Sequence, residues 1–383
     1  MKCERLFETV DSLADKYLSV WEDVCNIESP TNYKKGVDEV GAYFAEFAKK
    51  FGWEVEVLEQ PISGNCLCLT LNPNATTAPV SLSGHIDTVH PVGSFGSPAV
   101  RIEGDKIYGP GVVDCKGGAV AALMAMEALS LCGFTSRPVQ LLLQSDEENS
   151  SITSNKETVK FMAEKSKNAI AFLNCEGEHP GKLTMERKGI VRYCFEIQGI
   201  AAHSAMCAKQ GAGAIREAAY KIIELEKWKD HDGITCNCGV IQGGTVANTV
   251  PEFCAITADI RYQTAQELAE IEKHTKEIAD TSYVEGTSCN LVLQSHRVSM
   301  ELNEKNQHLF ERICEIYKEN GLTVPAMGKA NGGSDAADMS SYGIPTVDSI
   351  GIYGKHIHSL DEYAYIPSLA ETAKRLAAIV YSI

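Results

Sequence analysis

The sequence lacks any long hydrophobic segment. No apolar run approaches the roughly 20 residues that a helix needs to cross a bilayer. Residues 1–5 are mostly charged and lead directly into an amphipathic pattern, without the apolar centre and small-residue cleavage site of a signal peptide. These absences predict a cytoplasmic protein that neither spans nor binds a membrane.

Positive charge is also scarce, because 35 lysines and arginines stand against 51 aspartates and glutamates, a formal net charge of −16. A uniformly acidic protein repels nucleic acid and anionic membranes, so we expect neither as a partner. The chain contains no G-x-x-x-x-G-K-[ST] sequence and no G-x-G-x-x-G sequence after a predicted strand. These absences disfavour a nucleotide-binding α/β enzyme.

No C-x-x-C pair occurs among the fourteen cysteines, which are scattered through apolar segments. Disulfide frameworks and zinc sites made of cysteine need regular spacing that this chain does not have. We therefore expect most of these cysteines to be reduced, buried and apolar in character.

The length of 383 residues predicts two domains, and an apolar content of 44% is enough for a sizeable core. In the first part, helix-like and strand-like segments alternate. The expected helices are 4–28, 36–52, 116–132 and 155–166, and the expected strands are 53–59, 65–71, 79–85, 139–143 and 169–173. This alternation predicts an α/β domain whose mostly parallel, mixed sheet is flanked by helices.

The pattern changes near Arg187. The next elements follow the order β-α-β-β-α-β of a ferredoxin-like α+β unit: strands at 190–198, 237–242, 252–262 and 289–297, and helices at 211–228 and 264–281. A helix at 304–320, a strand near 346–350 and a helix at 367–381 then resume the first pattern. We therefore predict a discontinuous catalytic domain, residues 1–186 and 300–383, interrupted by a smaller domain, residues 187–299.

His85 and Asp87 lie two residues apart at the end of a predicted strand, so their side chains point the same way. His85 can bind a metal ion through one ring nitrogen while Asp87 accepts the proton on the other. Alone, this pair also fits an ordinary hydrogen-bonded pair of strand residues. The acidic residues elsewhere in the chain favour the metal site.

Asp114 lies between the glycines at 109 and 111 and a glycine-rich helix start. Glycine lets the backbone bend sharply and approach an ion closely. An aspartate at this place can also serve only as a helix N-cap. A carboxylate has two oxygens, however, and can bridge two ions.

Asp146, Glu147 and Glu148 directly follow a buried strand. Three successive carboxylates repel one another unless a cation or a proton intervenes, although a solvated loop would also tolerate them. In the functional interpretation, Glu148 is a metal ligand and Glu147 is a general base.

Two further residues complete the candidate set. Glu176 follows another predicted strand, and open α/β sheets bind ligands beyond the carboxyl ends of their strands. His358 lies in the loop before the last helix, with His356 as a competing candidate.

Charge counting favours two zinc ions. Their positive charge is balanced by Asp114, Glu148, Glu176 and one bridging hydroxide, and each ion then has a roughly tetrahedral set of nitrogen and oxygen ligands. The hydroxide would be the nucleophile, and Glu147 would pass the proton of its parent water to the leaving nitrogen. Co²⁺ or Mn²⁺ could substitute for zinc.

Together and in this order, five motifs resemble those of the M20 metallopeptidases. They are S-G-H-I-D-T-V at 83–89, G-x-G-x-x-D-x-K-G-G at 109–118, D-E-E at 146–148, Glu176, and G-x-x-x-H-x-x-x-E at 354–362. The family includes glutamate carboxypeptidase, acetylornithine deacetylase, succinyl-diaminopimelate desuccinylase and aminoacylase. At matching positions the resemblance implies metal ligands at His85, Asp114 (bridging), Glu148, Glu176 and His358. It also implies Glu147 as the catalytic base, Asp87 as the residue that orients His85, and a cis peptide after Asp114.

The resemblance further implies that the inserted domain is a lid and dimerisation domain, and hence a homodimer. His203 resembles a histidine that stabilises the oxyanion, often from the partner subunit. Asn248 and Arg261 resemble a pair that binds a substrate carboxylate, for which a guanidinium is well suited. Gly333 and Ser334 belong to a segment that resembles a loop near the substrate.

Two departures from the family pattern concern loops. Pro110 stands where the family usually has another residue, and residues 149–151 lack the glycine that commonly follows the paired glutamates. Neither departure removes a predicted metal ligand.

The sequence therefore predicts a di-zinc hydrolase that cleaves the amide bond of a small peptide or N-acyl amino acid with a free carboxylate. A carboxypeptidase of glutamate-carboxypeptidase type is preferred. An N-acyl amino acid deacylase and a di- or tripeptidase are the alternatives within this chemistry, since the pocket walls decide between them. A metal-free binding protein on the same fold is the alternative from a different class.

Overall fold

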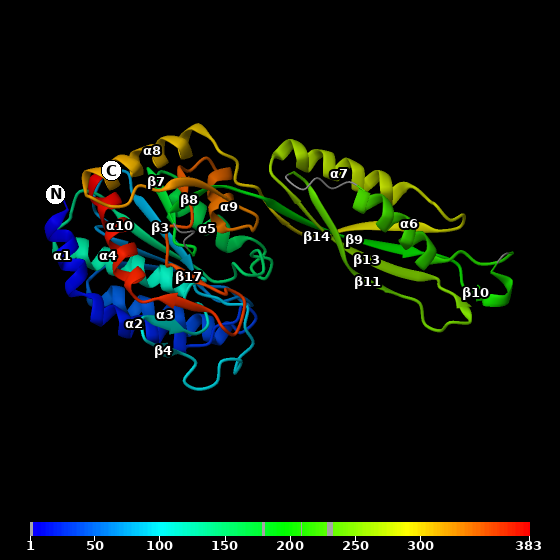
Figure 1. Cartoon of the computed structure of the whole chain (residues 1–383), viewed down its shortest axis with the longest axis horizontal. Helices are drawn as coiled ribbons and strands as arrows, with labels where there is room; N and C mark the ends of the chain where they lie inside the picture. The colour runs from blue at the N-terminus through cyan, green and yellow to red at the C-terminus, as the bar shows by residue number, and fades with distance from the viewer. Residues whose placement is uncertain (1–2, 178–180, 208, 228–232) are drawn as a thin grey trace. The chain divides into compact units, whose positions relative to one another are not determined.

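The computed structural model describes residues 3–177, 181–207, 209–227 and 233–383 (Figure 1). The chain forms two compact units. The larger unit comprises Met1–Met185, Leu302–Lys329 and Ser334–Ile383, and the smaller unit comprises Glu186–Glu301 and Ala330–Gly333. Among the described residues, no helix has the length and hydrophobicity that a membrane-spanning segment requires.

The larger unit is built on a six-stranded mixed sheet with the order β1-β2-β6-β3-β7-β16. β6, β3, β7 and β16 run parallel to one another, whereas β2 is antiparallel to both β6 and β1. Their bounds are Glu54–Leu58 (β1), Cys66–Leu71 (β2), Val80–His85 (β3), Val139–Gln144 (β6), Ala171–Asn174 (β7) and Thr346–Val347 (β16). The predicted mixed sheet is confirmed.

Helices cover both faces of this sheet. Alternate strand residues belong to different apolar clusters: Leu141 and Leu143 pack with α4, whereas Leu142 packs with α5 and α9. The helices are α1 (Glu4–Ser12), α2 (Ala14–Asn26), α3 (Lys34–Lys50), α4 (Lys116–Leu131), α5 (Glu157–Ser166), α8 (Glu304–Glu319), α9 (Asp335–Ser341) and α10 (Pro367–Ser382). Burial on both faces explains the continuous apolar runs of the central strands.

The single helix expected at 4–28 is wrong, because the segment forms two helices that meet at Leu13. The amide of Leu13 bonds to the carbonyl of Val10, three residues back, at 3.0 Å. The Ser12 hydroxyl meanwhile donates to the Thr9 carbonyl at 2.7 Å. Such local bonds compete with the regular i to i−4 ladder and end the first helix.

Several short strands were not expected from the sequence. In the larger unit, β4 (Arg101–Glu103), β5 (Lys106–Tyr108), β17 (Gly354–Lys355) and β18 (Tyr363–Tyr365) form an antiparallel sheet with the order β17-β18-β5-β4. β8 (Lys182–Arg187) pairs with β15 (Ala326–Ala330). The strands of two or three residues are too short to show a periodic pattern in the sequence.

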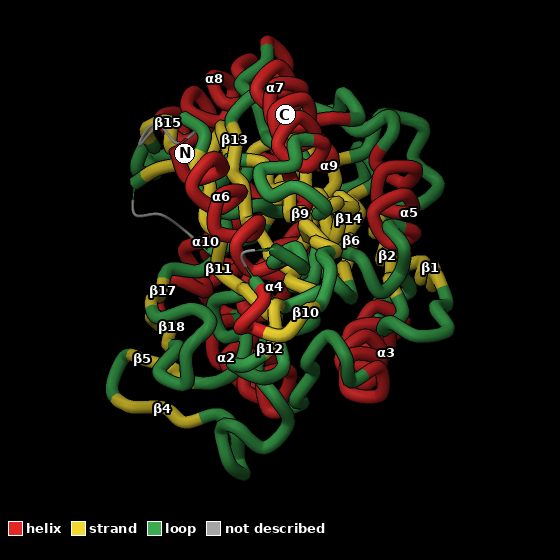
Figure 2. The backbone as a smooth tube through the Cα atoms, turned by 90° about the vertical axis from the view of Figure 1, so that its right-hand side faces the viewer, coloured by secondary structure: helices red, strands yellow, loops and turns green. Residues whose placement is uncertain are grey.

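The smaller unit contains an antiparallel sheet with the order β11-β13-β9-β14 (Figure 2). Its elements are β9 (Gly189–Gln198), β10 (Ala202–His203), a 3₁₀ turn (Ser204–Met206), α6 (Ala214–Lys227), β11 (Thr235–Gly243), β12 (Thr249–Val250), β13 (Phe253–Tyr262), α7 (Ala265–Asp280) and β14 (Ser288–Arg297). The four long strands and two helices have the split βαβ arrangement. They enclose a separate core around Phe195, Ile256 and Ile260.

Residues 330–333 lie outside the range expected for the inserted domain, yet they pack with the smaller unit. The Lys188 amide donates to the Ala330 carbonyl at 3.1 Å, and the Arg261 guanidinium donates to the Asn331 carbonyl at 2.7 Å. Such long-range backbone contacts leave no periodic signal in the sequence.

Candidate metal centre

Three neighbouring parallel strands deliver the candidate residues to one edge of the larger sheet. His85 is the last residue of β3, while Glu147 and Glu148 follow β6 and Glu176 follows β7. β3 pairs in parallel with both β6 and β7, so the carboxyl ends of these strands meet. This is the edge at which open α/β sheets bind ligands.

Asp114 lies between two imidazoles. Its Oδ1 is 2.8 Å from His85 Nε2, and its Oδ2 is 3.1 Å from His358 Nε2. Glu148 Oε2 lies 3.1 Å from His358 Nε2, and Glu176 Oε1 lies 3.6 Å from His85 Nε2. Each histidine therefore has one terminal carboxylate of its own and shares Asp114 with the other.

Asp87 connects the histidine to the glutamate pair. The Nδ1 atom of His85 is 3.0 Å from the Asp87 carbonyl and 3.4 Å from its carboxylate. That carboxylate also accepts the backbone N–H groups of Glu147 and Glu148, each at 3.2 Å, and the Thr31 hydroxyl at 2.7 Å. The closest partner of the Nδ1 atom is thus the backbone carbonyl of Asp87, and the Asp87 side chain chiefly anchors the segment that carries the two glutamates.

The electrostatics of the cluster suit cations. Burial opposes ionisation of Asp114, yet hydrogen bonds from His358 and His85 hold the pKa of its carboxyl below the usual value. Hydrogen bonding to Asp114 and Glu148 raises the pKa of His358 to about 10. Burial raises the pKa of Glu148 to about 8 and that of Glu176 well above its usual value. Three carboxylates gathered around two imidazoles form a charge excess that divalent ions would neutralise.

The donor atoms fit the implied metal. His85, Asp114 and Glu148 each offer a ligand atom, and these atoms lie within 4.8 Å of one another. Imidazole nitrogens and carboxylate oxygens are zinc ligands in open, catalytic sites. The residues present therefore fit a zinc centre.

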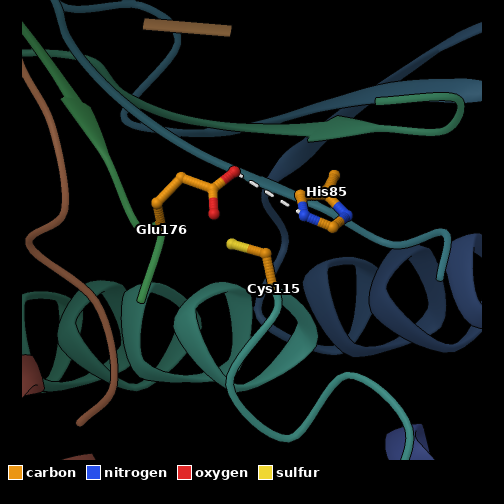
Figure 3. Close-up of side chains that lie close together, drawn as sticks. All are labelled: His85, Cys115 and Glu176. Carbon is orange, nitrogen blue, oxygen red and sulfur yellow. Dashed lines mark ion pairs between the residues drawn. The ribbon is translucent and has the colours of Figure 1, made fainter. Parts of the chain in front are cut away.

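The structure adds a thiol that the sequence interpretation did not place in the site. The ligand atoms of His85, Cys115 and Glu176 also lie within 4.8 Å of one another, and all three side chains point into one space in Figure 3. Cys115 donates its S–H to the Cys175 carbonyl at 3.0 Å, and burial raises the pKa of its thiol. The available sequence signal was its position directly after Asp114. The expected cis peptide between Asp114 and Cys115 is confirmed.

The loop after Glu148 departs from a glycine-containing form. Four non-glycine residues adopt left-handed backbone conformations: Ser150, Ser151, Asn155 and Lys156. Asp146 holds this loop, because its carboxylate accepts the Ser154 amide and the Thr158 hydroxyl, both at 2.8 Å. The first residue of the acidic run therefore supports the loop, which leaves the two glutamates for the site.

Of the two competing histidines, only one reaches the cluster. The His356 ring lies beside the Tyr363 ring with centroids 5.7 Å apart, and His356 is exposed. His358 contacts Asp114 and Glu148 instead. The geometry thus favours His358 as the ligand.

In the smaller unit, His203 and Asn248 lie close together. β10 pairs with β12 so that His203 faces Thr249, and the Ser204 amide donates to the Asn248 carbonyl at 3.0 Å. Both His203 and Asn248 are exposed. They form one exposed polar site beyond the end of β9.

Arg261 does not join them. It lies near the far end of β13, eight residues beyond Phe253, or about 26 Å along an extended strand. Its guanidinium bonds to Asp259 at 3.1 Å and to the Asn331 carbonyl at 2.7 Å. Within this unit Arg261 and Asn248 therefore lie toward opposite ends of the sheet, and their joint role in binding a substrate carboxylate stays a prediction.

Gly333 and Ser334 both lie in close contact with other residues of the protein. A side chain at Gly333 would collide with Arg297, since a Cβ there would lie 2.3 Å from the Arg297 Cδ. Ser334 is fully buried, and its hydroxyl donates to Asp348 at 2.5 Å. The Ser334 hydroxyl is thus engaged within the protein, and a place for this loop near the substrate stays a prediction.

Comparisons with known proteins agree with this geometry. The model of peptidase family M20/M25/M40 matches residues 81–382. Carboxypeptidase G2 from Pseudomonas sp. (strain RS-16) is 26% identical over 367 residues, which cover 94% of this chain and 87% of that protein. Succinyl-diaminopimelate desuccinylase from Dinoroseobacter shibae is 28% identical over 322 residues, covering 77% and 81%. The solved structure of aminopeptidase PepT from Bacillus cereus has the same fold, with a TM-score of 0.78, 20% identity, and 96% and 98% coverage.

Proposed function

The chain belongs to peptidase family M20/M25/M40, and from this premise we propose that it is a two-zinc carboxypeptidase acting on small peptides. Its membership makes it a metal-dependent hydrolase of peptide or acyl-amino acid type. The proposal adds the number and kind of ions, the residue roles and the preference for a substrate with a free carboxylate. Carboxypeptidase G2, the relative that is matched over 94% of this chain, supports that preference.

One observation carries the proposal: the two oxygens of Asp114 face two different imidazoles, at 2.8 and 3.1 Å. A single catalytic zinc ion takes three protein ligands, which would leave part of this set of five side chains unused. A carboxylate with a histidine on each side suits two ions that share it. We assign His85 and Glu176 to one ion, His358 and Glu148 to the other, and Asp114 to both.

The chemistry that bound ions supply at such a site is activation of water and polarisation of the scissile carbonyl. Glu147 is the proposed proton carrier. Glu147 is buried just beyond the carboxyl end of β6, and its backbone N–H donates to the Asp87 carboxylate. Glu147 would take a proton from the attacking water and deliver it to the leaving nitrogen.

The smaller unit would contribute polar groups to the substrate. We assign oxyanion stabilisation to His203, with Asn248 beside it, and recognition of the substrate carboxylate to Arg261. Because Asn248 and Arg261 lie at opposite ends of one sheet, we propose that they contact different parts of the substrate complex. The edge strand β11 carries the exposed Val240 and Ile241, which supports a homodimer formed through this unit.

A second candidate is an N-acyl amino acid deacylase or a di- or tripeptidase. The similarity to succinyl-diaminopimelate desuccinylase favours the first, and the fold shared with a solved tripeptidase from Staphylococcus aureus favours the second. All of these enzymes would use the same metal ligands, so the site itself does not discriminate between them.

The deciding experiment measures bound metal and substrate preference on the same purified protein. We expect two zinc ions per chain after reconstitution, and a clear loss of bound zinc in His358→Ala. His356→Ala is the matched control, since His356 is exposed and two residues away. A stoichiometry of one, or equal binding by both variants, would contradict the two-ion assignment. A panel of short peptides and N-acyl amino acids then separates the carboxypeptidase from the alternatives.

A further inference from the structure

Glu362 is a buried carboxylate outside the proposed ligand set. It follows His358 by four residues and is only 1% exposed. Its Oε1 accepts the backbone N–H groups of Val113 at 2.8 Å and of Asp114 at 3.1 Å. Its Oε2 accepts the N–H of Gly111 at 3.3 Å. A single side chain thus collects three amides from the loop that presents Asp114.

Backbone contacts extend this link. The Gly109 amide donates to the Glu362 carbonyl at 3.3 Å, and Tyr363 pairs with Tyr108 between β18 and β5. The segment that leads to Asp114 is therefore tied to the segment that follows His358.

The loop at residues 109–114 makes few contacts of its own that would fix the amides of Val113 and Asp114. Gly111 has a φ of +77°, a conformation that other residues rarely adopt. Its carbonyl accepts the Gly117 amide at 3.1 Å, which closes the loop on the helix side. At the other end of the loop, the Glu362 carboxylate accepts the amides of Val113 and Asp114.

Among the described residues, His90 and the buried Lys116 are cationic groups that interact with Glu362. His90 Nε2 lies 3.8 Å from Oε2, and the His90 ring packs edge-on against Phe95 with centroids 4.9 Å apart. This distance is longer than a hydrogen bond, so the three backbone amides are the close partners of the carboxylate.

We propose that Glu362 is a positioning residue of the metal centre, which fixes the Asp114 peptide so that each Asp114 oxygen faces one histidine. It acts through Asp114 and contacts neither the substrate nor the reacting atoms. Hydrogen bonds from several N–H groups to one carboxylate are strong and directional, which suits this role. The inference rests on the proposed function, because it concerns how that function's bridging ligand is held.

The test compares Glu362→Gln with Glu127→Gln. Glu127 is a matched control, because it is also buried and hydrogen-bonded, to Lys16 and Tyr17, within the same unit. In Glu362→Gln the side-chain amide would direct N–H groups toward the Gly111 amide, so one bond becomes a clash of donors. We expect the zinc dissociation constant to rise roughly 10- to 100-fold, the range seen when groups behind metal ligands are removed. The visible absorption of the cobalt form should also change. Glu127→Gln should alter neither.

A metal-free readout separates this inference from the proposed function. Hydrogen exchange of the apoprotein should become faster at residues 109–114 in Glu362→Gln and remain unchanged there in Glu127→Gln. If the wild type binds no metal, the two-zinc proposal fails, and apoprotein exchange still decides whether Glu362 orders the loop.

Two outcomes would overturn the inference. One is wild-type zinc affinity and cobalt absorption in folded Glu362→Gln, even with a lowered melting temperature, since that would leave Glu362 a purely structural role. The other is unchanged exchange at residues 109–114. If Glu362→Gln does not fold, Glu362→Asp takes its place. It keeps the charge but withdraws the carboxylate by one methylene, and it must show weaker zinc binding and faster loop exchange.

Discussion

Most candidate residues of the larger unit are buried or half-buried, with the exposed His358 as an exception, whereas those of the smaller unit are more exposed. In the larger unit, the side chain of His85 is 1% exposed and both ring nitrogens have partners. In the smaller unit, His203 and Asn248 are exposed, and the Arg261 side chain is 32% exposed. The candidate metal site is thus ordered by contacts within the larger unit, whereas the exposed groups of the smaller unit have fewer such contacts.

Buried charge alone does not distinguish the two units. In the smaller unit, Lys221 is fully buried, pairs with Glu217 at 3.1 Å and donates to the carbonyls of Ile278 and Thr281. These bonds join α6 to the end of α7. Among the described residues, the groups of three side chains close enough to hold an ion occur only in the larger unit. The candidate metal site differs from this structural ion pair because its carboxylates outnumber the histidines that they contact.

Removal of metal should have the largest effect on activity, and its effect on hydrogen exchange should differ between the two units. Prolonged chelation should abolish hydrolysis, and added zinc or cobalt should restore it. Because the ligands lie in the larger unit, hydrogen exchange should rise around Asp114 and remain unchanged in β9 and β13. Activity that persists in metal-free protein would contradict the metal mechanism for the whole chain.

Glu147→Gln should have the next largest effect. Loss of a general base typically costs about 10²- to 10⁴-fold in turnover, and we expect kcat to fall within this range. Bound zinc should remain, because Glu147 is not among the proposed ligands. Glu157→Gln, ten residues further along in α5, is the control. Normal turnover in Glu147→Gln would remove its role as the proton carrier.

His203→Ala tests whether the smaller unit takes part in the chemistry. Removal of one oxyanion-stabilising group costs about 10²- to 10³-fold in kcat. Zinc content and the melting temperature should stay as in the wild type, since His203 is exposed. A change confined to KM would instead make His203 a residue for substrate binding.

Arg261→Ala should have the smallest effect and the most selective one. We expect KM to rise about 10-fold for substrates with a free carboxylate, equivalent to the roughly 1.4 kcal/mol of one charged contact. Amidated substrates should be little affected. Arg192→Ala is a close control, because Arg192 binds the same Asp259 at 2.8 Å. An equal loss on amidated substrates would contradict the assignment.

Local sequence patterns predicted much of this fold because they reflect burial that repeats along the chain. The face formed by Val37, Val40 and Phe44 predicted α3, and the apolar run at 139–143 predicted β6. The break at Leu13 was missed, because it depends on side-chain bonds to the backbone rather than on periodicity. The short strands β4, β5, β17 and β18 form one sheet only because β5 pairs with the distant β18, and no local pattern records that pairing.

The residue types and their order along the chain were enough to indicate the class of chemistry, because imidazoles and carboxylates that follow buried strands reach a common sheet edge. The tertiary structure alone decided which atoms meet. It selected His358 over His356, brought the Cys115 thiol beside His85 and Glu176, and separated Arg261 from Asn248. It also brought the Glu362 carboxylate to the backbone amides of Val113 and Asp114. These outcomes depend on distances between residues far apart in the chain, and those distances arise only when the strands pair and the loops close.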